Sequence, residues 1–345
     1  MVAAIGYHAG VMSSADLQRS ILVRAPARLH LGFFDLNGSY GRRFGSLGLA
    51  ITGVEAAISA GPSRALDVRG PMAARVAEIA RAVADHCQRP CELAVTVKAM
   101  PPAHAGLGSG TLLSLAAGAA CAAALGVELD ARTLARLTGR GARSGIGIAA
   151  FEQGGFLVDG GRGAATDLPP LLARVGFPED WRCVLVFDER QAGLSGVAER
   201  TAFDTLTPMP DAEAAELSRR VLVGLLPALH EQDFDAFSMH LGQIQARVGA
   251  HFAPAQGGVF TSAPVAALLK TIAELFGLAG IGQSSWGPTG FIVTPDVQTA
   301  EQVVAFARQR AAEGLRCQIV AGANAGAIRQ AELAEPASVP SPLGE

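Results

Sequence analysis

The chain has 345 residues, half of them hydrophobic and 17% charged, and its formal net charge is −3. This composition is typical of a compact globular protein of about two domains, and it excludes an intrinsically disordered chain. The slightly negative charge excludes the basic surface expected of a nucleic-acid-binding protein. The five cysteines are odd in number and scattered along the chain, which favours a reducing, cytoplasmic setting.

The N-terminal portion predicts a loose tail followed by a β-hairpin. Residues 1–20 lack the apolar core of a signal peptide, and the true start is either Met1 or Met12. Residues 21–34 alternate apolar and polar side chains, and Asn37-Gly38 tolerates the positive φ angles of a tight hairpin. A glycine-rich, arginine-bearing segment then leads into the returning strand. The apolar runs of the chain are unsuited to crossing a membrane, so we expect no membrane partner.

The glycine loop at residues 106–111 is the most informative local motif. It reads Gly-Leu-Gly-Ser-Gly-Thr, follows a strand predicted at residues 93–100, and leads directly into a Leu/Ala-rich helix. The first turn of a helix carries unpaired N–H groups and partial positive charge, and glycines let an anion approach these groups closely. The pattern therefore predicts a phosphate site. The alternative is an ordinary helix start that Ser109 caps.

The remainder of the chain alternates predicted helices, strands and glycine-rich turns, which indicates a second unit of mixed α and β structure. Helices are predicted at residues 73–87, 131–140, 212–228, 233–248, 264–276 and 297–313, with a further short helix directly after Ser144. Strands are predicted at residues 156–158, 181–188, 290–294 and 316–320. Residues 250–260 and 280–289 are expected to be loops, and residues after about 331 a disordered tail.

Three glycine-bearing stretches, in this order, resemble the GHMP superfamily of small-molecule kinases: APARLHLGFFDLNGSYG, PPAHAGLGSGT and GQSSWGPTGF. The resemblance implies an α+β, GHMP-kinase-like two-domain fold with phosphates held in the cleft. The expected parts are a tail at residues 1–20, a ribosomal-protein-like N-terminal domain at 21–176, a ferredoxin-like C-terminal domain at 177–330 and a tail at 331–345.

Two positions depart from the kinase pattern of this superfamily. The kinases usually carry Ser-Gly-x-Asp where this chain has Ser144-Gly145-Ile146-Gly147, and their Asp deprotonates or orients the acceptor hydroxyl. Gly147 cannot accept a proton, which counts against a kinase without excluding one. In addition, Gly110-Thr111 stands where the kinases usually have Ser followed by Ala or Ser.

Four stretches together resemble a non-kinase branch, the β-ribofuranosylaminobenzene 5′-phosphate synthase family: APARLHLGFFDLNG, GLGSGT, SGIGIAAFEQGGFLVDGG and HFAPAQGGVF. This resemblance implies that phosphoribosyl pyrophosphate is joined to an aromatic acid, either 4-aminobenzoate or 4-hydroxybenzoate. CO₂ and pyrophosphate are released, at an early step of tetrahydromethanopterin biosynthesis. The sequence leaves the choice of acceptor open.

The implied reaction needs stabilisation of the leaving pyrophosphate and an aromatic ring held beside the ribose, so anion-binding groups matter more than a strong base. Donor phosphates are assigned to Gly106, Gly108, Ser109, Gly110 and Thr111. Candidates for the ribose 5-phosphate or the benzoate carboxylate are Arg28, Arg42 and Arg143. Substrate contacts are assigned to Ser144, Gln283, Ser284, Ser285 and Trp286. The Trp286 indole is expected either to stack on the acceptor or only to fill the core.

The candidate catalytic residues are His30, Asp35 and Glu152, and His30 would act on the ring amine or hydroxyl. We expect Mg²⁺ because pyrophosphate leaves best when its charge is neutralised, and Glu152 and Asp159 are its candidate ligands. Each of these residues has a structural alternative: a packed histidine in a strand, or a carboxylate in a turn or at the surface.

Two rival classes of protein fit the same resemblance. An ATP-dependent kinase would hydrolyse ATP in the presence of an acceptor alcohol, but the acidic residue near Gly147 is missing. A non-catalytic binding protein would keep the cleft and lose the polar loop residues, whereas Ser109, Thr111 and the paired Arg42-Arg43 are all present. We expect no organic cofactor and no nucleic acid partner, and a homodimer is left open.

Overall fold

The structure is a computed structural model that describes residues 19–191, 193 and 196–333, with the backbone alone for residues 19, 197–200, 204 and 333. The strands are β1 (Arg19–Asp35), β2 (Arg42–Pro62), β3 (Asp67–Arg69), β4 (Leu93–Ala99), β5 (Phe156–Gly163), β6 (Leu171–Val175), β7 (Arg182–Asp188), β8 (Ile281–Gln283), β9 (Gly290–Thr294), β10 (Leu315–Ala321) and β11 (Ile328–Leu333). The helices are α1 (Ala73–His86), α2 (Ser109–Ala124), α3 (Ala131–Leu137), α4 (Ile146–Gln153), α5 (Gly196–Thr205), α6 (Asp211–Arg220), the π-helical turn η2 (Val221–Leu225), α7 (Leu226–Glu231), α8 (Phe234–Gln256), α9 (Ala263–Phe276) and α10 (Val297–Arg310).

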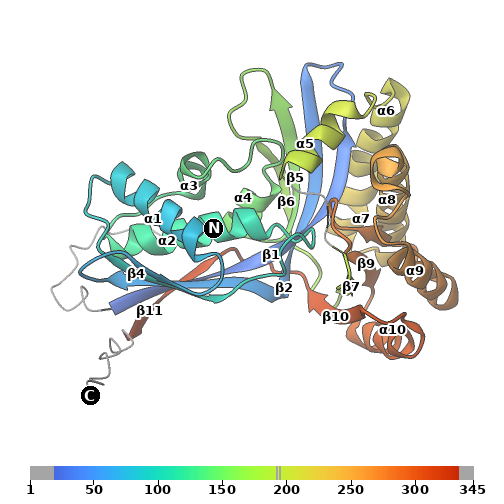
Figure 1. Cartoon of the computed structure of the whole chain (residues 1–345). Helices are drawn as coiled ribbons and strands as arrows, with labels where there is room; N and C mark the ends of the chain where they lie inside the picture. The colour runs from blue at the N-terminus through green and yellow to red at the C-terminus, as the bar shows by residue number, and fades with distance from the viewer. Residues whose placement is uncertain (1–18, 192, 194–195, 334–345) are drawn as a thin grey trace, which may run out of the picture.

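The first part of the molecule is a seven-stranded, mostly antiparallel sheet in the order β11-β1-β2-β4-β3, with β5 on β2 and β6 on β5. Figure 1 shows α1, α2 and α3 over one face of this sheet. Helix α2 packs on β1 and β2 and against α1, so its small and apolar side chains are buried from Leu112 to Ala122. The predicted helix after the glycine loop is therefore confirmed, and it is buried on most of its sides.

The second part is a four-stranded antiparallel sheet in the order β10-β7-β9-β8. Along the chain these are its fourth, first, third and second strands, the βαββαβ arrangement of a ferredoxin-like domain. Alternate side chains of β7 face opposite ways. Val184 and Val186 pack with α9 and α10, whereas Leu185 and Phe187 join the core shared with α8 and the first sheet.

The expected loop at residues 250–260 is wrong in its first half. Helix α8 continues to Gln256 and contains Pro254 in its last turn. A proline there removes only one backbone hydrogen bond. The buried side chains of Val248 and Phe252 keep this part of the helix packed in the core that both sheets share.

Strand β11 corrects the predicted end of the second domain. It pairs antiparallel with the start of β1, from Arg19 opposite Leu333 to Arg24 opposite Ile328. Residues 331–333, expected in a disordered tail, are therefore strand, and β1 begins at Arg19 inside the expected N-terminal tail. Backbone pairing along the edge of the first sheet explains both differences, because an unpaired edge would leave its N–H and C=O groups unsatisfied. Residues 334–345 lie outside the described part of the chain.

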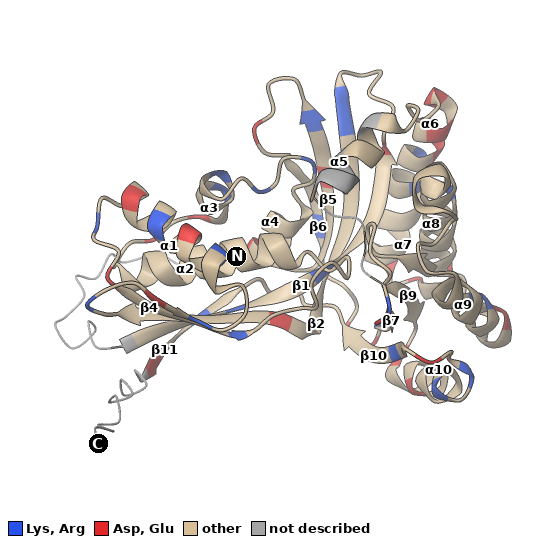
Figure 2. Ribbon diagram, in the orientation of Figure 1, with Lys and Arg blue, Asp and Glu red and all other residues tan. Residues whose placement is uncertain are grey.

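Charged side chains are distributed over many elements, as Figure 2 shows along the ribbon. Within the described residues, no helix has both the length and the apolar character required to cross a bilayer.

Candidate active site

Three segments that are distant in sequence meet at one place. The Ser284 hydroxyl accepts a hydrogen bond from the His30 amide at 3.0 Å and donates to the Gly106 carbonyl at 2.7 Å. The Ser285 amide donates to the His30 carbonyl at 3.1 Å. At Gly106, where φ is +79°, an added Cβ would lie 2.1 Å from the Ser284 carbonyl oxygen. The glycine is therefore required by this contact between the two domains, and the three stretches that carry the family resemblance form one site.

The start of α2 is open. The helix begins at Ser109, and the preceding Gly108 adopts a left-handed conformation, with φ of +75°, and offers no side chain to cap it. Within the described part of the chain, the amides of Ser109, Gly110 and Thr111 have no hydrogen-bond acceptor. The Ser109 cap considered from the sequence is not formed. Unpaired amides at the positive end of a helix dipole are suited to binding an anion.

Two arginines flank this open helix start. The Arg28 guanidinium donates to the Gly106 carbonyl at 2.7 Å, and its Cζ would lie 3.0 Å from a Cβ on Gly108. The Arg140 guanidinium would lie 3.3 Å from a Cβ on Gly110, and its Nε donates to the Ser114 hydroxyl at 3.2 Å. One guanidinium group therefore lies beside Gly108 and the other beside Gly110, and both add positive charge at the first turn.

Arg140 is a residue that the sequence analysis missed. Burial and the nearby charge of Arg75 lower the pKa of its guanidinium, and no carboxylate pairs with it among the described residues. A half-buried guanidinium without a carboxylate favours an external anion as its partner. The signal was present in the sequence as Gly139-Arg140-Gly141, the same combination of arginine and glycine that drew attention to Arg42-Arg43.

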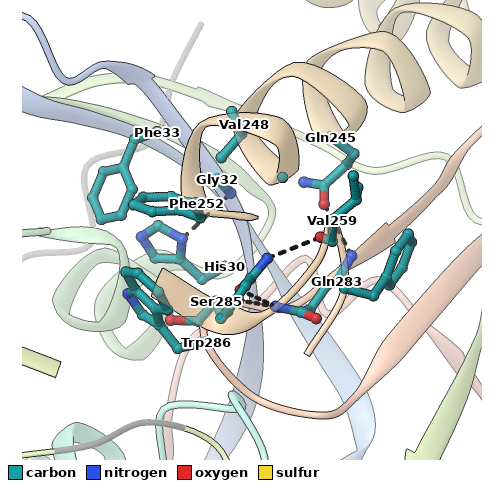
Figure 3. A pocket seen from close by; sticks show the side chains of 13 residues that line it. His30, Gly32, Phe33, Gln245, Val248, Phe252, Val259, Gln283, Ser285 and Trp286 are labelled. Carbon is teal, nitrogen blue, oxygen red and sulfur yellow. Dashed lines mark hydrogen bonds between the residues drawn. The ribbon is translucent and has the colours of Figure 1, made fainter. Parts of the chain in front are cut away.

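An aromatic pocket lies beside the anion site and has an empty volume of about 420 Å³, part of it open to solvent (Figure 3). Trp286 is buried, with its ring centroid 4.5 Å from Phe252 and 5.3 Å from Phe203. The glycine loop itself does not line the pocket, which joins the anion site through β1 and the Ser284–Trp286 segment. The lining residues are His30, Gly32, Phe33, Gln245, Val248, Gly249, Phe252, Gln256, Val259, Phe260, Gln283, Ser285 and Trp286.

His30 is held in a defined state at the edge of this pocket. A β-bulge interrupts the pairing of β1 with β2 between His30 and Phe33, and it turns the Gly32 amide toward the His30 ring. This amide donates to Nδ1 at 3.3 Å, so the neutral ring carries its proton on Nε2. Burial, and then the nearby charge of Arg28, lower the His30 pKa from 6.5 to about 3. His30 is therefore a neutral hydrogen-bond donor and a very weak base.

The residues that lead into α4 are engaged within the protein, and the Ile146 amide donates to the Ser144 hydroxyl at 3.2 Å. The carboxylate of Asp159 is fully buried, and its Oδ2 accepts from the Ser46 hydroxyl at 2.7 Å, the Ser144 hydroxyl at 2.9 Å and the Gly145 amide at 2.7 Å. Its Oδ1 accepts from the Gly161 amide at 2.9 Å. Burial raises the Asp159 pKa, and these four hydrogen bonds oppose that rise. The Ser144 hydroxyl, predicted to contact substrate, is therefore engaged in a hydrogen bond within the protein.

The remaining predicted site residues are engaged elsewhere. Arg42 donates to the carbonyls of Gly160 and Gly161, and the Asp35 carboxylate accepts from the amides of its own turn. The Arg143 guanidinium lies over the Phe203 ring, 4.6 Å from its centroid, and thus beside the aromatic cluster. These contacts give Arg42 and Asp35 roles in the hairpin.

The predicted magnesium ligands do not fit a metal site. Both oxygens of Asp159 already accept hydrogen bonds, and Glu152 lies exposed near the opposite end of α4. Along a helix, the seven residues from Gly145 to Glu152 correspond to about 10 Å. Among the described residues, no group of three or more His, Cys, Asp or Glu side chains could hold a metal ion. Asp159 instead holds Ser144 and Gly145, the two residues before α4.

Comparison with known proteins places this site in a family. Two family models match the chain, "GHMP kinases N terminal domain" at residues 74–155 and "GHMP kinases C terminal" at residues 225–313. The chain is 33% identical over 298 residues to the beta-ribofuranosylphenol 5'-phosphate synthase of Methanothermobacter thermautotrophicus, covering 80% of this chain and 89% of that protein. It is 37% identical over 287 residues to the protein of the same name from Archaeoglobus fulgidus, covering 79% and 87%. The chain belongs to the beta-ribofuranosylphenol 5'-phosphate synthase family.

Solved structures show the same fold in the wider superfamily. A homoserine kinase from Cytophaga hutchinsonii superposes with a TM-score of 0.63 at 17% identity, covering 94% of this chain and all of that one. A mevalonate diphosphate decarboxylase from Staphylococcus aureus has a TM-score of 0.63 at 14% identity, covering 90% and 98%. These likenesses confirm the predicted two-domain α+β fold, and membership of the synthase family supports the predicted synthase over the kinase alternative.

The two departures from the kinase pattern lie in contact with each other. A Cβ on Gly147 would lie 3.0 Å from the Thr111 Cγ2 and 3.4 Å from the Thr111 Cβ. The Thr111 side chain thus occupies the space into which a side chain at position 147 would extend. In this synthase-family chain, the first turns of α2 and α4 are fitted to each other through a threonine and a glycine.

Proposed function

We propose that this protein joins phosphoribosyl pyrophosphate to 4-hydroxybenzoate, with loss of CO₂ and pyrophosphate. The observation that carries the proposal is that an anion site lies next to an aromatic pocket. The anion site is the open start of α2 with its two arginines, and strand β1 contributes Arg28 to this site and His30 to the pocket. The donor has two phosphorylated ends, and the acceptor is a flat ring. A site with an anion-binding half and an aromatic half suits this pair of substrates.

In the proposed reaction, the ring carbon that bears the carboxylate supplies the electron pair of the new bond to C1 of the ribose. The bond from C1 to the pyrophosphate oxygen breaks, and its electron pair leaves with pyrophosphate. The bond to the carboxylate then breaks, CO₂ departs, and its electron pair restores the aromatic ring. No proton has to be removed by a side chain, which agrees with a site whose only pocket histidine is a very weak base.

The contribution of the protein is electrostatic and positional. Negative charge grows on the pyrophosphate as it leaves, and the first-turn amides of α2, with the Arg28 and Arg140 guanidinium groups, are placed to stabilise that charge. Packing between Phe33, Phe252 and Trp286 would hold the acceptor ring beside C1. Mg²⁺ stays a prediction, and it would arrive bound to the donor because the expected protein ligands do not fit.

The hydroxyl-bearing acceptor follows the names of the relatives, which are called synthases of a phosphorylated ribofuranosylphenol. The alternative acceptor is 4-aminobenzoate. The two are related by one substituent opposite the carboxylate, so they can be compared directly in one assay.

The test is incubation of the protein with phosphoribosyl pyrophosphate, Mg²⁺ and carboxyl-labelled 4-hydroxybenzoate, followed by measurement of labelled CO₂. Parallel reactions contain labelled 4-aminobenzoate, or ATP in place of the sugar donor. We expect CO₂ from 4-hydroxybenzoate, less from 4-aminobenzoate and none with ATP. Absence of CO₂ from both acids would refute the proposed function, and faster release from 4-aminobenzoate would refute the choice of acceptor.

A further inference from the structure

The aromatic pocket contains two N–H groups that lack a hydrogen-bond acceptor. The Trp286 indole N–H is buried and has no partner, in a side chain that is only 3% exposed. The His30 Nε2–H also has no acceptor within the described residues, because only Nδ1 of that ring is engaged. An unpaired buried donor destabilises a protein unless a ligand or water satisfies it. The buried Trp286 donor, together with the unpaired His30 N–H in the same pocket, therefore indicates a ligand with an acceptor atom.

The other polar side chains of the pocket are largely occupied by one another. The side-chain carbonyl of Gln283 accepts from the backbone amide of Thr261 at 2.6 Å. The side-chain carbonyl of Gln245 accepts from the backbone amide of Gln283 at 3.0 Å. The side-chain carbonyl of Gln256 accepts from the side-chain N–H of Gln283 at 3.2 Å. The Ser285 hydroxyl can donate or accept, so it adapts to either kind of ligand atom. The polar preference of the pocket is consequently set by the two unpaired N–H groups, which can only donate.

We propose that the N–H groups of His30 and Trp286 hold the ring oxygen of a hydroxyl-bearing aromatic acid and select this acid over the corresponding amine. This inference rests on the proposed function, because it names the residues that recognise its acceptor. A phenol or phenolate oxygen accepts hydrogen bonds, whereas an aromatic amine would direct its own N–H groups at two donors. The amine would therefore leave the buried Trp286 N–H unsatisfied.

The ring oxygen fits this position better than the carboxylate does. The carboxylate is attached to the carbon that bonds to the ribose, so it must lie toward the anion site, and the oxygen lies at the opposite end of the ring. Firm binding of the carboxylate would also stabilise a group that has to leave. Two donors at the ring oxygen stabilise its negative charge instead, and a negatively charged oxygen makes the opposite ring carbon a better nucleophile.

The test is isothermal titration of the full chain with 4-hydroxybenzoate, 4-aminobenzoate and unsubstituted benzoate, with pyrophosphate present to fill the anion site. Trp286→Phe keeps an aromatic ring and removes the N–H, and His30→Leu removes the other donor. Each substitution is expected to weaken the binding of 4-hydroxybenzoate by about tenfold, the value of one hydrogen bond to a buried oxygen. Binding of 4-aminobenzoate and benzoate is expected to change by less than about twofold.

Matched controls separate recognition from general damage. Trp181→Phe alters the other tryptophan, which lies between Phe177 and Phe234 outside the pocket, and His240→Leu alters a histidine of α8 that does not line it. Both should leave all three affinities unchanged. His30→Gln retains an N–H donor and adds a carbonyl, so it is expected to bind 4-hydroxybenzoate nearly as well as the wild type and 4-aminobenzoate better.

Two results would overturn the inference. The first is equal weakening of all three acids by Trp286→Phe and His30→Leu, which would mean that the donors hold the carboxylate. The second is a wild type that binds benzoate as tightly as 4-hydroxybenzoate. The binding measurement does not depend on turnover, so a wild type that selects 4-hydroxybenzoate but releases no CO₂ would refute the proposed function alone.

Discussion

The starts of α2 and α4 lie side by side, but the residues at these two starts differ in their hydrogen-bond partners. At α4, the buried Asp159 carboxylate accepts from the Gly145 amide and two serine hydroxyls. At α2, the amides that follow Gly108 have no acceptor within the described residues, and two guanidinium groups add positive charge. The comparison indicates that a helix start is suited to binding an anion when no side chain caps it and cationic side chains lie beside its first turn.

Removal of the Asp159 carboxylate should have the largest effect. Asp159→Ala removes a fully buried carboxylate that accepts from two serine hydroxyls and two amides, and we expect the free energy of unfolding to fall by about 3 kcal/mol. Asp130→Ala is the matched control, because Asp130 caps α3 through the Thr133 amide but lies exposed; its loss should cost about 1 kcal/mol. Urea denaturation measures both. Equal losses would contradict the assigned role of Asp159.

Addition of a carboxylate to the open start is the complementary experiment. Ser109→Asp places a negative charge where the donor phosphates would bind, and we expect pyrophosphate affinity to fall by about a hundredfold in titration calorimetry. The free energy of unfolding should not fall, because an acidic residue in the first turn interacts favourably with the helix dipole. Ser109→Asn, similar in shape and uncharged, should retain most of the affinity. Unchanged binding in Ser109→Asp would show that the phosphates lie elsewhere.

Neutralisation of the flanking arginines tests the other half of the comparison. Arg28→Gln and Arg140→Gln should each weaken pyrophosphate binding by about tenfold to a hundredfold, the range for loss of a charged hydrogen bond. The salt dependence of binding should also become shallower. Arg42→Gln, whose guanidinium contacts two backbone carbonyls in the hairpin, is the control and should bind as the wild type does. An effect of Arg42 equal to that of Arg140 would count against the proposed site.

The smallest expected effect concerns the contact that joins the two helix starts. Alanine favours a helix over glycine by about 1 kcal/mol, but a Cβ at position 147 would press on the Thr111 methyl group at 3.0 Å. Gly147→Ala should therefore fail to stabilise the wild type and should stabilise the Thr111→Ser variant, which lacks that methyl, by about 0.5–1 kcal/mol. Thermal unfolding of the four proteins measures this coupling. Identical shifts in both backgrounds would rule it out.

Local sequence predicted much of the fold and the centre of the site. The strand, glycine loop and helix around Gly108 are contiguous, so their geometry follows from residues close in sequence. The loop predicted at residues 250–260 failed because burial of Val248 and Phe252 outweighs the local effect of Pro254. Here packing between distant elements decided the structure, and a single sequence does not reveal such packing.

For individual site residues, too, the residue type could be predicted from the sequence, but the role set by contacts between distant elements could not. Asp159 has the chemistry of a metal ligand, and only its pairing opposite Ser46 across β5 and β2 shows that its oxygens serve the start of α4. Arg140 was overlooked because its distance from Gly110 depends on how α3 packs beside α2. Trp286 and His30 were predicted individually, but their unpaired N–H groups became visible only when the hydrogen-bond partners of the whole pocket were known.

The return of β11 to the first sheet has a mechanical consequence. The chain leaves that sheet after Val175, builds the second domain, and rejoins β1 at Ile328. Two stretches of chain therefore connect the second domain to the first sheet, one between β6 and β7 and the other between β10 and β11. Any widening between the Gly106 loop and the Ser284 loop therefore has to be accommodated at both connections.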